Sequence, residues 1–427
     1  MKKKNDVFVF GLAIFAMFFG AGNLIFPPEI GLMAGREWLT ASMGFFITGI
    51  CLPVCGILAF SRVADVNKFA NKVSDGFNTG YFTLLILAIG PMLGIPRTGA
   101  TAYEMGIVPN FGKVNPLLVS AIYFTVVYIL VINPSRLINN IGKFLTPVIL
   151  SILGFIIVKG SIIGLGTPSD KLITQSTFSY GFLGGYQTMD AITSVILGTI
   201  IVTGLRGNGY TEEKEQRSMV IKSGLIAGLG MALVYGGLLY LGAMASGSGL
   251  TMDRAALVMY FATATLGGLG TIALGTCVTV ACLTTSIALA AIVSDFFSEK
   301  TRFSYKGIAL ITCVFSAILS ATGVGFIVDI AVPILTLLYP VTIILIALNV
   351  FKCNNSNIFK SSIYTGLSFS LLEVVSKSGI LPGAESIFNL VPFSSEGFAW
   401  LIPTITVSLL VKFFEKDFLF EKKIFKC

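Results

Sequence analysis

The chain has 427 residues, of which 55% are hydrophobic and 12% are charged, and its formal net charge is +8. Soluble domains carry about 25% charged residues, so this composition excludes a soluble globular protein. The sequence contains no histidine, which excludes Ser-His-Asp hydrolases, histidine-ligated zinc or haem sites and simple histidine proton relays.

Apolar runs close to the roughly 20 residues that cross a bilayer as a helix recur along the whole chain. They predict an all-α integral membrane protein with about twelve transmembrane helices and a single transporter domain over residues 1–427. The polar connections are too short to fold separately, and no concentrated set of catalytic groups is present, so we expect transport and no enzymatic activity. The approximate bounds of the predicted helices are 7–31, 38–60, 80–104, 116–133, 142–166, 186–206, 218–245, 267–295, 305–323, 326–351, 358–377 and 397–414.

Basic residues are distributed unevenly between the predicted loops. Most of the 29 Lys and Arg fall in the N-terminal segment, in every second loop and in the C-terminal tail. By the positive-inside rule, this pattern predicts a multi-pass protein of the cell membrane with both termini in the cytoplasm. The basic charge is therefore a topology signal and does not indicate nucleic-acid binding. We expect the lipid bilayer as the surroundings, and no sequence pattern sets an oligomeric state.

The stretch "FFGAGNLIFPP" interrupts the first apolar run with glycine, asparagine and proline. An unwound segment inside hydrocarbon is tolerated only where protein buries it or where it lines a wet cavity. The N–H groups freed near Ala21 and Gly22 suit a carboxylate, and the carbonyls freed from Ala16 to Phe19 suit a cation. Asn23 adds an amide oxygen, so the stretch predicts a site for a zwitterion and a sodium ion at the membrane midplane. The alternative is a glycine packing notch between helices.

Charged residues fall inside several predicted helices, where an unpaired arginine costs about 2.5–3.5 kcal/mol. Arg97 lies in the third helix, and Glu104 is two turns further along the same face. Asp190, Glu29 and Asp329 lie toward the outer halves of other helices. We expect Arg97 to pair with one of these carboxylates and to contribute to the outer gate or line the pathway. A fixed structural ion pair is the alternative.

The sixth predicted helix carries Gly198 and Thr199 near its centre, with Gly204 as an alternative point of interruption. Interrupted helices at corresponding positions of two halves point to a transporter site. We therefore expect helices 1 and 6 to be discontinuous, with Gly198 and Thr199 at the substrate site. The implied arrangement is a 5+5 inverted repeat with boundaries at about 7–166 and 186–351, plus two peripheral helices at about 358–414.

The run "ACLTTSIALAAIVSDFF" places a cluster of hydroxyl side chains inside the eighth predicted helix. The oxygens of Thr284 and Thr285 are suitable ligands for a hard cation such as sodium. The alternative is that these hydroxyls donate back to carbonyls of their own helix.

Three stretches, "FFGAGNLIFPPEIGLMAG", "GIPRTGATAYEMG" and "GYQTMDAITSVILG", resemble signature stretches of the bacterial branched-chain amino acid transporters, the BrnQ or LIVCS family. The chain length and the predicted helix layout agree with that family from end to end. More distantly, "GAGN" with the following "FP" and the run "LTTSIA" are similar to the first and eighth helices of LeuT-type sodium symporters. The resemblance implies a LeuT-like fold and uptake of leucine, isoleucine and valine.

The LeuT-type resemblance also implies roles for single residues. Ala21 and Gly22 would offer N–H groups to the substrate carboxylate. The Phe18 carbonyl would lie near the substrate ammonium, and Asn23 would face a first cation. A second sodium would lie between the first and eighth helices, held by Ala16, Phe19, Thr284 and Thr285. We find no counterpart of the third-helix tyrosine of LeuT-type sites.

We expect a secondary active transporter that imports branched-chain amino acids with sodium by alternating access, with no cofactor beyond the coupling ion. The sequence lacks a Walker-type phosphate-binding loop, which argues against ATP-driven transport. One alternative is a proton-coupled neutral amino acid transporter that titrates Asp190, Glu104 or Glu29. A channel or membrane sensor without coupling is the other.

Overall fold

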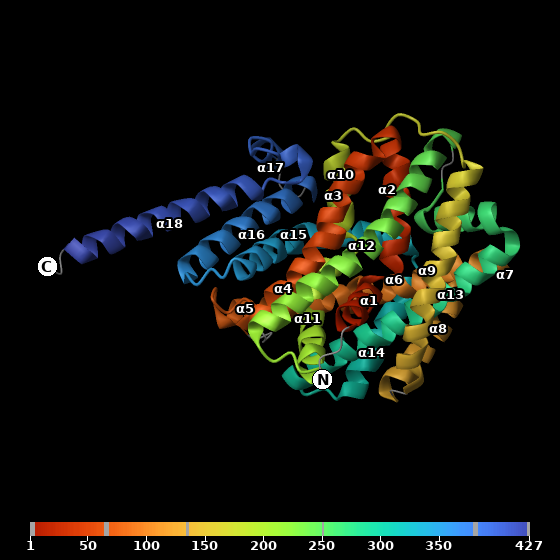
Figure 1. Ribbon diagram of the computed structural model, residues 1–427, viewed down its shortest axis with the longest axis horizontal. Coiled ribbons are helices and arrows are strands. Elements are labelled where there is room, and N and C mark those ends of the chain that lie inside the picture. The colour runs from red at the N-terminus through yellow and green to blue at the C-terminus, as the bar shows by residue number, and fades with distance from the viewer. Residues whose placement is uncertain (1–4, 64–67, 134–135, 250–251, 379–382, 425–427) are drawn as a thin grey trace.

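The computed structural model describes residues 5–63, 68–133, 136–249, 252–378 and 383–424. Within these ranges the regular secondary structure is entirely helical (Figure 1). Three π-helical segments, Ile47–Cys51, Ala88–Met92 and Ala102–Ile107, interrupt or join α-helices. The α-helices are α1 (Asp6–Phe18), α2 (Ala21–Ala34), α3 (Trp38–Phe46), α4 (Leu52–Val63), α5 (Asp75–Leu87), α6 (Gly94–Thr101), α7 (Val108–Phe111), α8 (Pro116–Ile132), α9 (Arg136–Ile163), α10 (Thr177–Tyr186), α11 (Asp190–Gly207), α12 (Glu213–Ala245), α13 (Arg254–Lys300), α14 (Tyr305–Ser320), α15 (Val324–Val350), α16 (Ser356–Ser378), α17 (Ala384–Phe388) and α18 (Leu401–Ile424).

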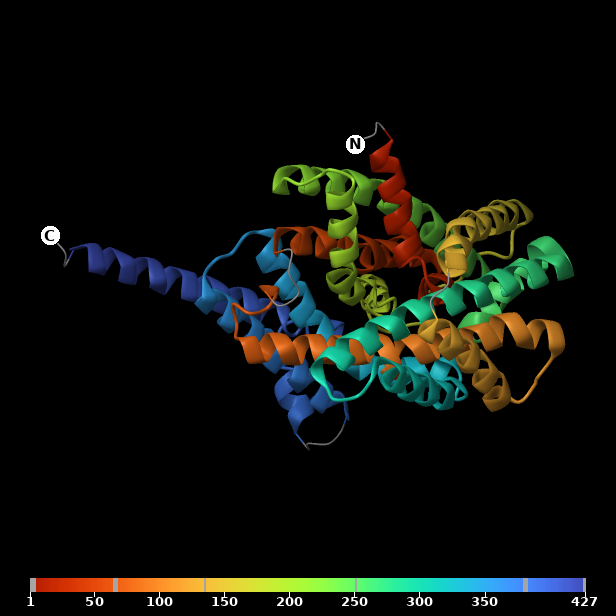
Figure 2. The same ribbon diagram turned by 90° about the horizontal axis from the view of Figure 1, so that it is seen from below.

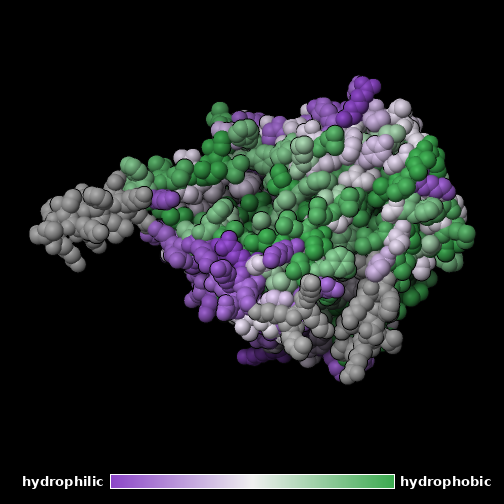
Figure 3. All heavy atoms as spheres, in the orientation of Figure 1, coloured by the Kyte–Doolittle hydropathy of each residue, from purple (hydrophilic) through white to green (hydrophobic). Residues whose placement is uncertain are grey.

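Six helical stretches of the described residues are long and apolar enough to cross a membrane, and shorter apolar helices accompany them. Large apolar side chains such as Leu39, Ile122 and Phe155 lie on the surface, where lipid suits them better than water. Figure 3 shows hydrophobic side chains over the middle of one face and hydrophilic side chains gathered toward its upper and lower edges. The predicted all-α membrane class is confirmed, whereas the count of twelve spans and the repeat boundaries stay predictions.

The first spanning helix is broken where the glycine-rich stretch predicts it. α1 ends at Phe18 and α2 begins at Ala21. Phe19 has ψ 90°, and Gly20 is fully extended with φ −118° and ψ −173°. The two prolines that follow, Pro27 and Pro28, lie inside α2 and do not end it. The predicted discontinuity of helix 1 is therefore confirmed.

The sixth spanning helix is also broken, but the break does not lie at Gly198 near its centre, where the sequence predicts it. α10 ends at Tyr186 and α11 begins at Asp190, and the intervening Met189 has a left-handed φ of 60°. The break predicted at Gly198 and Thr199, or alternatively at Gly204, is wrong, because all three residues lie within the continuous helix α11. A Cβ on Gly198 would come within 2.7 Å of the Phe60 side chain on α4, so this glycine serves close helix packing.

The third spanning helix contains an interruption that the sequence analysis did not predict. Gly90 has non-helical angles of φ −88° and ψ −118°, and Pro91 follows it inside the π-helical segment Ala88–Met92. π-Bulges often occur at functional sites because they redirect the residues that follow. Here the helix resumes at Gly94 and carries Arg97 in its first turn. Figure 2 shows α5 to α7 running alongside α13, which also contacts α6 directly.

Helix α13 bends sharply at Gly267, which has φ 65° and ψ −157°. A positive φ of this kind is accessible to glycine at little cost. The predicted eighth helix, 267–295, begins at this bend, so Thr284 and Thr285 lie in the part of α13 that follows it.

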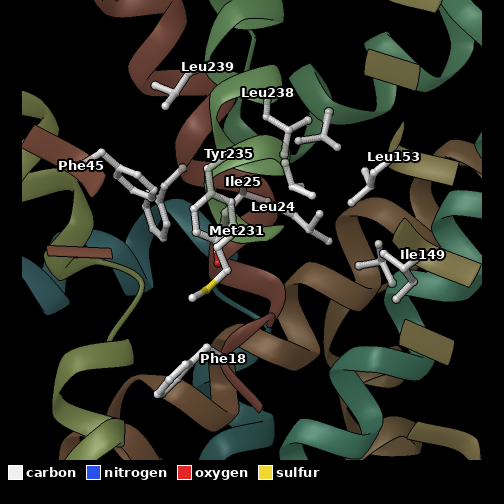
Figure 4. Close-up of a cluster of buried hydrophobic side chains, with 14 of the residues drawn as sticks. Phe18, Leu24, Ile25, Phe45, Ile149, Leu153, Met231, Tyr235, Leu238 and Leu239 are labelled. Carbon is white, nitrogen blue, oxygen red and sulfur yellow. The ribbon is translucent and has the colours of Figure 1, made fainter. Parts of the chain in front are cut away.

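A buried apolar cluster holds the second half of the broken first helix against α12 and α9 (Figure 4). Leu24 from α2, Leu238 from α12 and Leu153 from α9 belong to it. Close approach of α2 and α12 requires glycine, because a Cβ on Gly31 would collide with the backbone of Leu239. This packing fixes the backbone that carries the break and thereby positions the first residues of α2.

Candidate functional site

Both broken helices border one cavity of about 360 Å³, together with α6 and the second part of α13. This volume falls in the range of about 300–1,000 Å³ that is usual for small-molecule sites. The lining residues are Ala16, Met17, Phe18, Gly20, Gly22, Asn23, Ile89, Gly94, Arg97, Thr98, Thr188, Met189, Asp190, Thr193, Leu197, Ile200, Thr284, Thr285, Ala288, Leu289 and Ile292.

The cavity brings together most of the residues that the sequence singles out. Those on its lining are Ala16, Phe18, Gly22, Asn23, Arg97, Asp190, Thr284 and Thr285. Phe19 lies beside it at the break and stacks on Tyr235 with ring centroids 6.3 Å apart. Gly198, Thr199, Glu104, Glu29 and Asp329 lie outside this lining. The side chain of Ala21 lies outside the part of the chain that the structure describes. The functional roles assigned to all of these residues stay predictions.

Asn23 connects the two broken helices. Its Oδ1 accepts a hydrogen bond from the Gly20 N–H at 3.3 Å, which caps α2. Its Nδ2 donates to Asp190 Oδ2 at 2.6 Å and to the Tyr235 hydroxyl at 2.5 Å. Only 2% of Asn23 is exposed, so each lost partner would leave a buried polar group unpaired. The amide therefore fixes the Asp190 carboxylate and the start of α2 in one arrangement.

Arg97 reaches from the third helix to both breaks. Its Nη1 donates to the carbonyl oxygen of Gln187 at 2.5 Å, between α10 and α11. A Cβ on Gly22 would lie 2.9 Å from Nη2, so the guanidinium sits directly against the glycine backbone of α2. The Arg97 Cζ also lies 5.4 Å from the centre of the Phe26 ring, at cation–π distance.

The cavity lining contains two opposite charges, Arg97 and Asp190, each of which is only 5% exposed. Among the described residues, the structure records no carboxylate within the 4.0 Å of an ion pair from Arg97. A buried charge without a direct partner is unfavourable. Within the described part of the chain, this conformation therefore lacks the predicted ion pair of Arg97 with Glu104, Asp190, Glu29 or Asp329.

A hydroxyl network positions the turn that carries Arg97. Thr98 donates to the Ile95 carbonyl at 2.6 Å, and its hydroxyl also contacts the Ser286 hydroxyl on α13. Ser286 in turn lies 3.0 Å from the Tyr123 hydroxyl on α8. Since Thr98 and Ser286 are both buried, these bonds hold the third, fourth and eighth spanning helices in register around the cavity.

Thr284 and Thr285 both donate to the Ala281 carbonyl, at 2.9 Å and 3.0 Å. This is the back-bonding alternative of the sequence analysis, yet the hydroxyl oxygens keep lone pairs and both residues line the cavity. Ala16 also lines the cavity. In a continuous helix its carbonyl would accept the Gly20 N–H, but that N–H donates to Asn23 instead. Carbonyl and hydroxyl oxygens of this kind are the donor set of a hard monovalent or divalent cation.

The remaining wall of the cavity is apolar. It is formed by side chains from four spanning helices, namely Met17, Ile89, Leu197, Ala288, Leu289 and Ile292. The lining therefore offers both polar groups and apolar side chains, which a zwitterion with a hydrocarbon side chain needs.

The third-helix and sixth-helix linings contain residues that the sequence analysis missed. Ile89, Gly94 and Thr98 come from the third helix, and Thr188 and Met189 come from the sixth-helix break. The run "GPMLGIPR" contains two glycines and two prolines within an apolar stretch, which is a sufficient signal for an interruption there.

A second cavity of about 190 Å³ is lined among others by Phe26 and Gln187, both of which Arg97 contacts, and by Glu29, Tyr180 and Arg254. Glu29 Oε1 accepts from Arg254 Nη2 at 3.0 Å and from the Tyr180 hydroxyl at 3.1 Å. The Arg254 Cζ lies 5.8 Å from the same Phe26 ring that Arg97 contacts.

The two other candidate carboxylates have different surroundings. Glu104 Oε1 accepts the N–H of Val324 at 2.8 Å and so caps the start of α15. Asp329 is exposed on α15.

Comparison with known proteins places the chain in a family. The family model described as "Branched-chain amino acid transport protein" matches residues 3–418. The branched-chain amino acid permease BraB of Bacillus subtilis is 36% identical over 423 residues, covering 95% of this chain and 94% of that protein. The permease BrnQ of Escherichia coli is 32% identical over 421 residues, covering 96% of this chain and 95% of that protein.

Solved structures share the fold. Mhp1 in an inward-facing conformation matches with a TM-score of 0.61 at 15% identity, covering 95% of this chain and 90% of Mhp1. MhsT in complex with L-phenylalanine matches with a TM-score of 0.55 at 16% identity, covering 96% of this chain and 98% of MhsT. The predicted LeuT-like architecture is confirmed, and the chain is a transport protein and not an enzyme: it belongs to the branched-chain amino acid transport protein family.

Proposed function

We propose that this protein imports leucine, isoleucine and valine by symport with sodium. The observation that carries the proposal is the cavity at which both helix breaks meet, whose lining combines the charged groups of Arg97 and Asp190 with apolar side chains. The relatives at 36% and 32% identity are named branched-chain amino acid permeases, which supports the same substrate class.

Sodium coupling is supported by residues on the cavity lining that can supply oxygen ligands. Ala16 comes from the broken helix α1, and Thr284 and Thr285, which carry hydroxyls, come from α13. A sodium ion held there would join the first and eighth spanning helices, and its charge would favour entry of the substrate carboxylate. Ion and substrate would then bind cooperatively, as coupled transport requires.

Alternating access is supported by the wall between the two cavities. Arg97 lines the larger cavity, whereas Phe26 and Gln187 line the smaller one, and Arg97 contacts both residues. With the N-terminus of α1 in the cytoplasm, as the basic residues predict, the larger cavity lies on the cytoplasmic side of this wall. We take the conformation to be closed outward and assign the Glu29–Arg254 ion pair to its closed outer layer.

The test is uptake of labelled leucine into proteoliposomes that contain the purified protein. We expect accumulation with an inward sodium gradient and little with a matched choline gradient. Unlabelled isoleucine and valine should compete, whereas lysine and glutamate should not. Accumulation that is equal in both gradients would refute sodium coupling, and absence of leucine binding and uptake would refute the substrate class.

The second candidate is proton-coupled transport of the same substrates. It is favoured by one observation, the buried carboxylate of Asp190 beside the two breaks. Uptake would then follow an imposed pH gradient in sodium-free buffer and would be lost in Asp190→Asn. The proteoliposome assay distinguishes the two candidates when each gradient is imposed alone.

A further inference from the structure

The larger cavity holds one guanidinium and one carboxylate that face the same space without forming an ion pair. Arg97 and Asp190 are both 5% exposed, and each is held by hydrogen bonds to other groups. Two opposite charges free to move would be expected to meet, because their attraction is strong where water is scarce. Here the Gln187 carbonyl holds Arg97, and Asn23 holds Asp190, so the two charges line one cavity without forming an ion pair.

The surroundings of Arg97 suit an incoming carboxylate. Its Nη2 lies against Gly22 in the first turn of α2, where helix N–H groups point outward without intrahelical partners. Guanidinium and helix N-terminus both favour a negative charge. Their convergence at one point gives a carboxylate two independent sets of donors.

The surroundings of Asp190 suit an incoming ammonium. Asn23 donates to one carboxylate oxygen of Asp190, Oδ2, and Asp190 also lines the cavity. Phe18, the last residue of α1, lines the same space, and the last carbonyls of a helix carry the negative end of its dipole. A carboxylate next to carbonyl oxygens offers an ammonium three acceptors for its three protons.

From this arrangement we propose that Arg97 and Asp190 bind the two charged ends of the substrate, the guanidinium taking the α-carboxylate and the aspartate taking the α-ammonium. The inference rests on the proposed function and adds to it the residues that select an α-amino acid from other small apolar molecules. Arg97 and Asp190 then recognise the substrate, instead of forming the gate or ion pair that the sequence predicts. The hydrocarbon side chain then lies against Ile89, Leu289 and Ile292.

The test is a crossed measurement with two analogues of leucine, each lacking one charge. Leucinol keeps the ammonium and replaces the carboxylate by an alcohol, whereas 2-hydroxy-4-methylpentanoate keeps the carboxylate and replaces the ammonium. Dissociation constants for leucine and both analogues are measured by calorimetry or competition on purified protein in nanodiscs, in sodium buffer. Since hydrogen bonds to charged groups contribute strongly, Arg97→Ala should weaken leucine binding by about 10- to 100-fold and leave leucinol almost unchanged. Asp190→Asn should weaken leucine binding by a similar factor and leave the hydroxy acid almost unchanged.

Matched controls come from the outer layer. Arg254 contacts the same Phe26 ring as Arg97, and Glu29 is a partly buried carboxylate, but neither lines the larger cavity. Arg254→Ala and Glu29→Gln should alter binding of the three ligands by one common factor. The charge-retaining variants Arg97→Lys and Asp190→Glu are measured in parallel. Size-exclusion chromatography of all variants shows whether a loss of leucine affinity reflects misfolding.

Three results would overturn the inference. The first is an equal loss of affinity for leucine and both analogues in each variant, which a structural role predicts. The second is unchanged leucine affinity in both variants. The third is a wild-type protein that binds both analogues as tightly as leucine. If the wild-type protein accumulates leucine with sodium but the two variants do not show the crossed pattern, this inference fails and the proposed function stands. If the wild-type protein does not bind leucine, the proposed function itself fails.

Discussion

Asn23 and Asp190, which are 167 positions apart in the sequence, are joined by a hydrogen bond of 2.6 Å from Nδ2 to Oδ2. One residue lies in the first turn of α2 and the other is the first residue of α11. The bond therefore ties the second halves of the two broken helices to each other at the cavity. A movement of either half that opened or closed the site would have to be shared by the other.

Replacement of Asn23 by alanine should destabilise the protein. The change removes the partners of the Gly20 N–H, the Asp190 carboxylate and the Tyr235 hydroxyl. Each buried polar group left unpaired costs about 1–3 kcal/mol. We expect a clearly lower Tm in detergent and loss of leucine binding. The control is Asn208→Ala, because Asn208 is exposed and, among the described residues, its side chain bonds only to the Gly204 carbonyl. Equal Tm values for Asn23→Ala and Asn208→Ala would contradict the prediction.

Replacement of Gly22 by alanine should displace Arg97 without unfolding the protein. The added Cβ would lie 2.9 Å from Nη2 and 3.2 Å from Cζ, so the flexible guanidinium must move. We expect leucine affinity to fall by about tenfold or more, which corresponds to about 1.4 kcal/mol. Equilibrium binding to purified protein measures the effect.

A glycine with open space around it serves as the comparison for Gly22. A Cβ on Gly76, in the first turn of α5, would meet nothing within 4 Å. Gly76→Ala should keep wild-type affinity and gain about 0.4–1 kcal/mol of stability, because alanine restricts the unfolded chain. A Gly22→Ala variant with wild-type affinity would mean that the position of the guanidinium does not matter to binding.

The helix 1 break and the membrane class could be predicted from the sequence because their causes are local. Gly20 adopts an extended conformation directly after α1, and the residues around it have low helix propensity. Apolar runs likewise follow from composition alone. Phe18, Gly22 and Asn23 were found for the same reason, since a break exposes the residues beside it.

The helix 6 break was misplaced because its cause is not local. Met189 adopts a left-handed conformation that its side chain does not favour, and the segment is held by Arg97, which donates to the Gln187 carbonyl from another helix. Gly198, the stronger local signal, serves packing against Phe60 instead. Only the tertiary structure distinguishes a glycine that permits close contact from one that permits a break.

Replacement of Gly198 by alanine tests this correction. The new Cβ would come within 2.7 Å of the Phe60 Cβ and 2.8 Å of its Cγ, so α4 and α11 must separate. Overpacking of this kind costs about 1–3 kcal/mol. We expect a lower Tm with leucine and sodium affinities close to wild type, both measured at a temperature well below the transition. A selective loss of leucine affinity with unchanged Tm would return Gly198 to the substrate site.

Replacement of Thr285 by alanine should weaken sodium dependence. The change removes one hydroxyl oxygen from a residue that lines the cavity together with Ala16 of α1. We expect the sodium concentration for half-maximal leucine uptake to rise by about tenfold, which corresponds to about 1.4 kcal/mol. Thr125→Ala is the control, because Thr125 makes the same back-bond, to the Ala121 carbonyl at 2.7 Å, on an exposed face of α8. An equal and small effect of both variants would show that Thr285 only bonds its own helix.

Exchange of the outer ion pair should restore function that single changes remove. Glu29 and Arg254 are 3.0 Å apart and only 16% and 28% of their side chains are exposed, so breaking the pair leaves a poorly hydrated charge without its partner. We expect Glu29→Arg and Arg254→Glu each to slow leucine uptake in proteoliposomes by about tenfold or more. The double exchange should recover a large part of the wild-type rate, because attraction across the layer returns with reversed polarity. A double variant that is as slow as the slower single variant would contradict this prediction. The Glu29 carboxylate and the Arg254 guanidinium would then act separately, for example through their contacts with Tyr180 and Phe26, and not as a pair that closes the outer layer.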